Sequence, residues 1–198
     1  MTRYQISHVD KICIPLTSYT APGQLLKIIE MARLDDVWVV SEAGTPWLSD
    51  PAKELIKLCR EHDCPFEVLP WANALIPAVV ASPCDTTHFS YHGFLPTKKW
   101  RKALIIQITQ SEYPSFIYES VHRVDKFLEE LKGLEFAGMV GIFRELSKMY
   151  EQKLIGTVDE LLALRGNKLV AKGEFVIGIY PAKDKEKGKR NKYPKEEQ

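Results

Sequence analysis

Short apolar runs alternate with helix patterns along the first half of the chain, and this alternation limits the folds available to it. Residues 37–40 are apolar throughout and have polar neighbours, which is typical of a strand buried on both faces of a parallel sheet. A helix pattern over 24–33 precedes this run, and a second helix is expected to open at Pro51. Residues 66–69 form the next expected strand and 74–81 the next helix. The alternation predicts a right-handed α/β unit.

The second half of the chain alternates in the same way and is richer in aromatic residues. Strands are expected at 89–94, 115–118, 139–143 and 174–180, and helices at 98–110, 124–131 and 158–164. We therefore predict an α/β protein of two domains, an N-terminal one over 1–84 and a C-terminal one over 85–182. The charged segment 183–198 lacks apolar periodicity, so a disordered tail is expected there.

Composition and charge exclude several classes of protein. Hydrophobic residues make up 45% of the 198 positions and charged residues 27%, as in globular domains. No apolar stretch is long enough for a membrane span, and the N-terminal residues lack the apolar core of a signal peptide. A cytoplasmic protein without membrane contact is expected. The net charge is only +1, so a nucleic-acid site would have to be a local basic patch.

The cysteines do not suggest a disulfide framework. The four of them form no C-x-x-C pair and are expected to be reduced thiols. Cys84, His88 and His92 have a spacing that zinc ligands can show, but a zinc site needs a fourth ligand in convergent geometry. We therefore predict no metal site.

A glycine-containing loop follows the expected strand at 37–40. Gly44, Thr45 and Pro46 lie in this loop, at the carboxyl end of a strand where open α/β sheets bind ligands. A glycine there lets a ligand approach the backbone closely. Taken alone, Gly44 is more typical of an ordinary turn.

Four sequence blocks in the second half occur in an order that is more specific than any one of them alone. They are HGFLP at 92–96, FIYESVHR at 116–123, RELSK at 144–148 and GEFV at 173–176. In this order they resemble the ribosomal RNA small subunit methyltransferase I family, a branch of the tetrapyrrole methylase-like superfamily of S-adenosylmethionine-dependent methyltransferases. The resemblance extends from about residue 39 to residue 180.

The resemblance implies a fold, a cofactor and a reaction. It implies a two-domain tetrapyrrole methylase-like architecture with S-adenosyl-L-methionine in the cleft between the domains, 2′-O-methylation of a cytidine ribose in small-subunit ribosomal RNA, and a homodimer. The residues matching the cofactor-binding positions are Ser41, Glu42, Ala43, Gly44, Thr45, Asn73, Ala74 and Tyr118.

The sequence departs from the family pattern in two places. The family domain opens with a strand and loop that this sequence begins too late to supply, so the first domain is expected to be incomplete. Trp71-Ala72-Asn73 stands where the family has Gly-Pro-Ser. The indole of Trp71 could obstruct the cofactor pocket or stack on an adenine.

Methyl transfer to a ribose hydroxyl of RNA calls for two kinds of residue, a base and groups that bind RNA. A ribose hydroxyl is a poor nucleophile and benefits from a nearby base, and the residue pattern does not decide among the candidates Glu42, Glu119, Glu145 and His122. Each could instead shape a loop through ion pairs. RNA needs positive charge and stacking surfaces, for which Trp100 is the aromatic candidate. The basic candidates are Lys98, Lys99, Arg101, His122, Arg123, Arg144 and Lys148.

Two other functions stay open at this point. The departures at the front and at residues 71–73 are compatible with an inactive descendant that binds RNA or a partner protein. The superfamily also allows a methyltransferase that acts on a tetrapyrrole or another small molecule.

Overall fold

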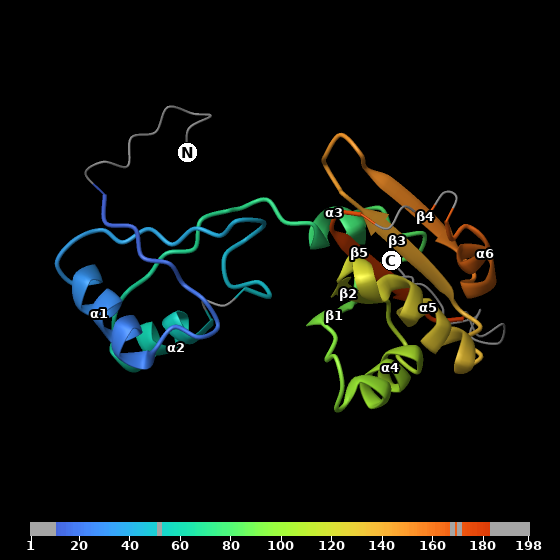
Figure 1. The fold of residues 1–198 in the computed structure, drawn as a ribbon, viewed down its shortest axis with the longest axis horizontal. Helices are drawn as coiled ribbons and strands as arrows, with labels where there is room; N and C mark the ends of the chain where they lie inside the picture. Colours follow the sequence, from blue (N-terminus) through green and yellow to red (C-terminus); the bar gives the residue numbers. More distant parts are fainter. Residues whose placement is uncertain (1–10, 51–52, 167–168, 170–171, 183–198) are drawn as a thin grey trace, which may run out of the picture. The chain divides into compact units, whose positions relative to one another are not determined.

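The computed structural model describes residues 11–50, 53–166, 169 and 172–182 (Figure 1). The chain forms two compact units, Met1–Ala72 and Asn73–Gln198. The division lies earlier than the boundary expected after residue 84, because helix α3 (Leu75–Val80) packs against strand β5 (Phe175–Tyr180) of the second unit. The expected tail at 183–198 lies outside the described residues.

The second unit contains a five-stranded sheet with the order β1-β2-β5-β3-β4. The remaining strands are β1 (Ser90–Phe94), β2 (Ser115–Glu119), β3 (Met139–Arg144) and β4 (Gln152–Gly156). Strands β1 and β2 are parallel, whereas β5 is antiparallel to both β2 and β3, and β4 is antiparallel to β3. The sheet is therefore mixed, with β5 at its centre.

Helices and the sheet enclose the main hydrophobic core of this unit. The helices are α4 (Arg101–Thr109), α5 (Val124–Gly133) and α6 (Val158–Ala163), and the short 3-10 helix η2 (Val121–Arg123) leads into α5. Phe127, Leu128 and Leu131 project from α5 into this core, where they meet Ile117 of β2 and Ile177 of β5. The expected α/β class is confirmed in this unit. No helix among the described ranges is long and apolar enough to cross a membrane.

The first unit holds two helices among its described residues, α1 (Pro22–Ala32) and α2 (Lys53–Glu61). Both were expected, although Pro51, the expected first residue of the second helix, lies outside the described residues. Leu25, Ile28 and Ile29 of α1 and Leu55 of α2 form a small core with Cys64, which follows α2.

The strands expected at 37–40 and 66–69 are wrong. Neither run belongs to a β-ladder, and Trp38 is 74% exposed. A strand buried on both faces needs hydrogen-bonded neighbours and a packed layer on each side. The described part of this unit supplies neither, so the apolar composition of these runs indicated burial that the fold does not provide.

Candidate functional site

All four blocks singled out in the sequence lie at one edge of the sheet. Strands β1 and β2 are parallel, and β5 runs antiparallel to both β2 and β3, so β1, β2 and β3 all end at the same edge. Glu119 and Arg144 both align with Phe175 in the ladder. The loops after β1, β2 and β3 therefore start side by side, and we call this the carboxyl edge of the sheet.

The turn after β1 presents two cations and an indole to solvent. Lys98 and Lys99 are exposed, and Trp100 is 68% exposed. The Lys99 ammonium lies 5.3 Å from the centre of the Trp100 ring. Trp100 also has a φ of 69°, a left-handed backbone conformation that residues other than glycine rarely adopt. The fold thus holds these side chains outward at some cost in backbone strain.

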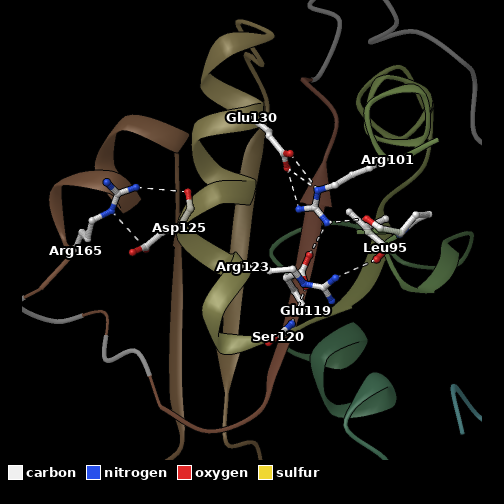
Figure 2. Close-up of polar contacts among 9 residues, drawn as sticks. Leu95, Arg101, Glu119, Ser120, Arg123, Asp125, Glu130 and Arg165 are labelled. Atoms are coloured by element: carbon white, nitrogen blue, oxygen red, sulfur yellow. Dashed lines mark hydrogen bonds and ion pairs between the residues drawn. The ribbon is translucent and has the colours of Figure 1, made fainter. Parts of the chain in front are cut away.

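Arg101 differs from its neighbours, and the expectation that it contacts RNA needs correction. Its side chain is 4% exposed and forms ion pairs with Glu119 at 3.1 Å and with Glu130 at 2.8 Å (Figure 2). The positive charge of Arg101 is thereby balanced by carboxylates of the same chain. A buried guanidinium with two carboxylate partners is not available to a phosphate.

Arg123 is engaged in the same way. Its Nε lies 2.6 Å from Oε1 of Glu119, and its Nη1 donates to the carbonyl of Leu95 at 3.5 Å. Glu130 was not predicted as part of this group, since nothing in the local sequence links it to Arg101, which lies 29 positions earlier.

The four candidate bases differ in burial and in their hydrogen-bond partners. Glu119 is buried between the guanidinium groups of Arg101 and Arg123, so its carboxylate has a structural role as the partner of both cations. Glu145 accepts hydrogen bonds from the backbone N–H of Glu174 at 2.8 Å and from Lys148. Glu42 and His122 are exposed.

The loop after β3 is built from hydrogen bonds. Arg144 donates to the carbonyls of Lys172 and Tyr150, and Lys148 bridges Glu145 at 3.3 Å and Glu174 at 2.9 Å. Arg144 and Lys148 therefore have partners within the chain. Their positive charges shape this loop, although the Lys148 side chain keeps 47% of its exposure.

Glu145 gives this loop a pH dependence. The hydrogen bond from Glu174, together with Lys148, holds the pKa of Glu145 below its ordinary value. Its stabilising effect is therefore present above the pKa of the unfolded chain, about 4.3, and is lost as the pH falls through the lower folded-state pKa. We expect Glu145→Gln to reduce the free energy of unfolding at pH 7 and to have little effect at pH 3, as measured by urea unfolding at both pH values.

Glu135→Gln is the control for this prediction. Glu135 is exposed in the turn after α5, so the variant should follow the wild-type pH profile. A loss in Glu145→Gln of equal size at both pH values would contradict the assigned role of the carboxylate.

The expected cofactor loop of the first unit forms a tight turn. Ser41 Oγ donates to the carbonyl of Gly44 at 2.6 Å, and Thr45 Oγ1 donates to the carbonyl of Trp71 at 3.2 Å. Gly44 has a φ of 77° with no heavy atom within 4 Å of the place where a Cβ would stand. A glycine is thus required by the backbone conformation, and the space beside it is open to a ligand.

A cavity of about 730 Å³ lies in the same unit. Thr45, Trp47 and Trp71 line it together with the two apolar runs. Its volume lies in the range of about 300–1,000 Å³ that is typical of small-molecule sites. Trp71 lines the cavity and is partly exposed.

The other expected cofactor residues belong to the second unit. Asn73 Oδ1 accepts a hydrogen bond from the backbone N–H of Ile76 at 3.0 Å, so this side chain caps the first turn of α3, next to Ala74. Tyr118 packs edge-on against Tyr91 at 5.3 Å between ring centres. Burial raises the pKa of the Tyr118 phenol, which therefore stays protonated at neutral pH.

The residues with zinc-like spacing have other neighbours. Cys84 Sγ lies 3.6 Å from Ser82 Oγ, and the His88 ring packs on Tyr113. Within the described ranges, no three His, Cys, Asp or Glu side chains are grouped so as to hold a metal ion.

Comparison with known proteins identifies the chain's relatives. The chain is 39% identical to a ribosomal RNA small subunit methyltransferase I of Hydrogenobaculum over 167 residues, which cover 82% of this chain and 72% of the relative. It is 36% identical to the Synechocystis protein of the same name, over 73% of this chain and 52% of that relative. The chain thus spans from about half to about three quarters of the length of these relatives.

A solved structure has the same fold at low sequence identity. It is a uroporphyrin-III C-methyltransferase from Thermus thermophilus complexed with S-adenosylhomocysteine, with a TM-score of 0.51 and 16% identity over 79% of this chain and 71% of that one. The family model for tetrapyrrole (corrin/porphyrin) methylases matches residues 19–162, which is most of the chain. The chain therefore belongs to the tetrapyrrole methylase family.

Proposed function

We propose that this protein uses S-adenosyl-L-methionine to methylate small-subunit ribosomal RNA, at the 2′-hydroxyl of a cytidine ribose. The observation that carries the proposal is the carboxyl edge of the sheet, where the exposed Lys98, Lys99 and Trp100 follow β1 and His122 follows β2. Cations beside an exposed indole suit single-stranded RNA, because the cations attract phosphates and the ring stacks on a base. The name shared by the two relatives supports the same substrate class.

The cofactor is proposed to bind at the Ser41–Thr45 turn, with Asn73, Ala74 and Tyr118 as further contacts. The open backbone at Gly44 supports this assignment. When bound, S-adenosylmethionine supplies an activated methyl group, so the protein's part is to orient the acceptor hydroxyl and to take up its proton. Glu42 and His122, which are exposed, are the proposed bases.

Assembly and location follow from the same resemblance. We propose a homodimer in the cytoplasm, where small ribosomal subunits are found. Light scattering of the purified protein at micromolar concentration should give twice the chain mass of 22.6 kDa, and a strictly monomeric mass would contradict the dimer.

The direct test is transfer of labelled methyl groups to small ribosomal subunits that lack the modification. We expect wild-type protein to label the RNA, and the double variant Lys98→Gln/Lys99→Gln to have a raised KM for the subunit. Each lost phosphate contact should also reduce the slope of log affinity against log salt concentration by about 0.7–0.9. Transfer rates measured at several salt concentrations check both effects.

Lys126→Gln is the matched control, since Lys126 is an exposed lysine on α5 and should leave KM and the salt slope unchanged. Labelling of a tetrapyrrole in place of RNA would overturn the proposal in favour of a small-molecule enzyme. RNA binding without any methyl transfer would overturn it in favour of a binding module.

A further inference from the structure

Glu119 joins two segments that carry the exposed RNA-facing side chains. It is the last residue of β2, and its side chain has no exposed surface. Oε2 accepts a hydrogen bond from Arg101 Nη1 at 3.1 Å. Oε1 accepts one from the backbone N–H of Ser120 at 2.7 Å and lies 2.6 Å from Arg123 Nε. Each carboxylate oxygen is therefore used by a different part of the carboxyl edge.

The two guanidinium groups extend this connection to the turn after β1. Arg101 Nη1 also donates to the carbonyl of Pro96 at 3.3 Å, and Arg123 Nη1 donates to that of Leu95 at 3.5 Å. Figure 2 shows both arginines directed at Glu119 from opposite sides, with Leu95 beside them. The backbone that precedes the exposed turn is thus held by two side chains that share one carboxylate.

The exposed residues lie between these anchored points. Arg101 donates a hydrogen bond to the carbonyl of Pro96 and so closes the segment between them. Lys98, Lys99 and Trp100 are exposed residues of this segment. His122 stands between Ser120 and Arg123, both of which contact Glu119. The group is also electrically balanced, because Glu130 provides the second negative charge at 2.8 Å from Arg101. A buried charge group of this kind resists distortion, since separating any pair leaves an uncompensated charge.

We infer that Glu119 is a positioning residue that fixes the 96–101 turn and the 120–123 turn in one arrangement for RNA binding. The inference rests on the proposed function for the identity of the ligand. It assigns Glu119 no contact with the substrate and no part in proton transfer.

The test compares Glu119→Gln with wild type in two independent measurements. The amide retains the shape of the side chain but removes the charge shared by the two arginines. Hydrogen exchange of the amides at 97–101 and 120–123 should become faster by a larger factor than that of β5, whose exchange follows the global stability. In the methylation assay, KM for the ribosomal subunit should rise by about tenfold or more, because small misplacements of positioned groups have large effects. The Kd for S-adenosylmethionine should stay unchanged.

Two further variants separate positioning from general damage. Glu130→Gln removes one of the two carboxylate partners of Arg101 and should loosen the 96–101 turn without affecting 120–123. Lys132→Gln removes an ion pair between two exposed side chains, Lys132 and Asp159, at the end of α5 opposite to the 120–123 turn, and should change neither measurement.

The outcomes are distinct. Unchanged exchange and unchanged KM in folded Glu119→Gln would overturn the inference, and so would a fall in kcat with KM unchanged, which indicates a smaller folded fraction. If Glu119→Gln does not fold, Arg123→Gln, which removes one of the two cations paired with Glu119, decides by its effect on exchange in the 120–123 turn. If wild-type protein transfers no methyl group to RNA, the proposed function fails, and the exchange measurement still tests the positioning.

Discussion

Arg101→Met is expected to lower the free energy of unfolding of the second unit by about 3–5 kcal/mol, the usual cost of breaking a buried ion pair by removing one partner. Methionine is similar in volume and fills the apolar part of the site. It leaves Glu119, which has no exposed side-chain surface, with Arg123 as its remaining cationic partner in the described contacts. Glu130 is 27% exposed and can turn to water. Urea unfolding followed by circular dichroism measures the loss.

The double variant Arg101→Met/Glu119→Gln distinguishes lost charge balance from lost packing. A neutral amide needs no counter-charge, so the double variant should lose less stability than the sum of the two single variants, by about 0.5–3 kcal/mol. Arg165→Met is the control, because the Arg165 pairs are exposed and such pairs contribute about 1 kcal/mol or less. Equal losses in Arg101→Met and Arg165→Met would contradict the role assigned to burial.

Phe127→Ala is expected to have a similarly large effect, a loss of about 3–5 kcal/mol. Phe127 lies on α5 with no exposed surface, inside the core formed by the helices and the sheet. Removing the ring takes away its burial and leaves a cavity that the surrounding strands cannot close. The same unfolding experiment measures this variant.

Met149→Ala is the comparison for the core variant. Met149 is 89% exposed in the loop between β3 and β4, so its loss should change stability by no more than about 0.5 kcal/mol. A Phe127→Ala variant as stable as Met149→Ala would show that α5 does not contribute to the core between the helices and the sheet.

The second unit could be predicted from the sequence almost element by element. The runs at 115–118 and 139–143 are strands within a residue of the observed ends, and the helix pattern at 124–131 is α5. The apolar pattern of the sequence and the burial in the structure agree there, because each run either belongs to the sheet or packs against it. Strand β4 was not expected, since Lys153 and Ile155 of this edge strand are exposed and no continuous apolar run marks it.

The first unit shows why the same reasoning fails elsewhere. An apolar run such as 37–40 indicates that a segment can be buried, but the neighbours that bury it come from other parts of the fold. The candidate site divides in the same way. Exposure of Lys98 and Lys99 could be expected from their charge, whereas the burial of Arg101 depends on Glu130, which is 29 residues away in sequence and adjacent only in the folded chain.

The shared carboxylate of Glu119 separates what can vary during evolution from what cannot. Positions 98–100 and 122 carry exposed side chains that positions 101, 119, 123 and 130 do not contact in the described structure, so they can be exchanged one at a time without disturbing the supporting group. Positions 101, 119, 123 and 130 form one charge-balanced group, so a change at one of them is tolerated only with a matching change at another.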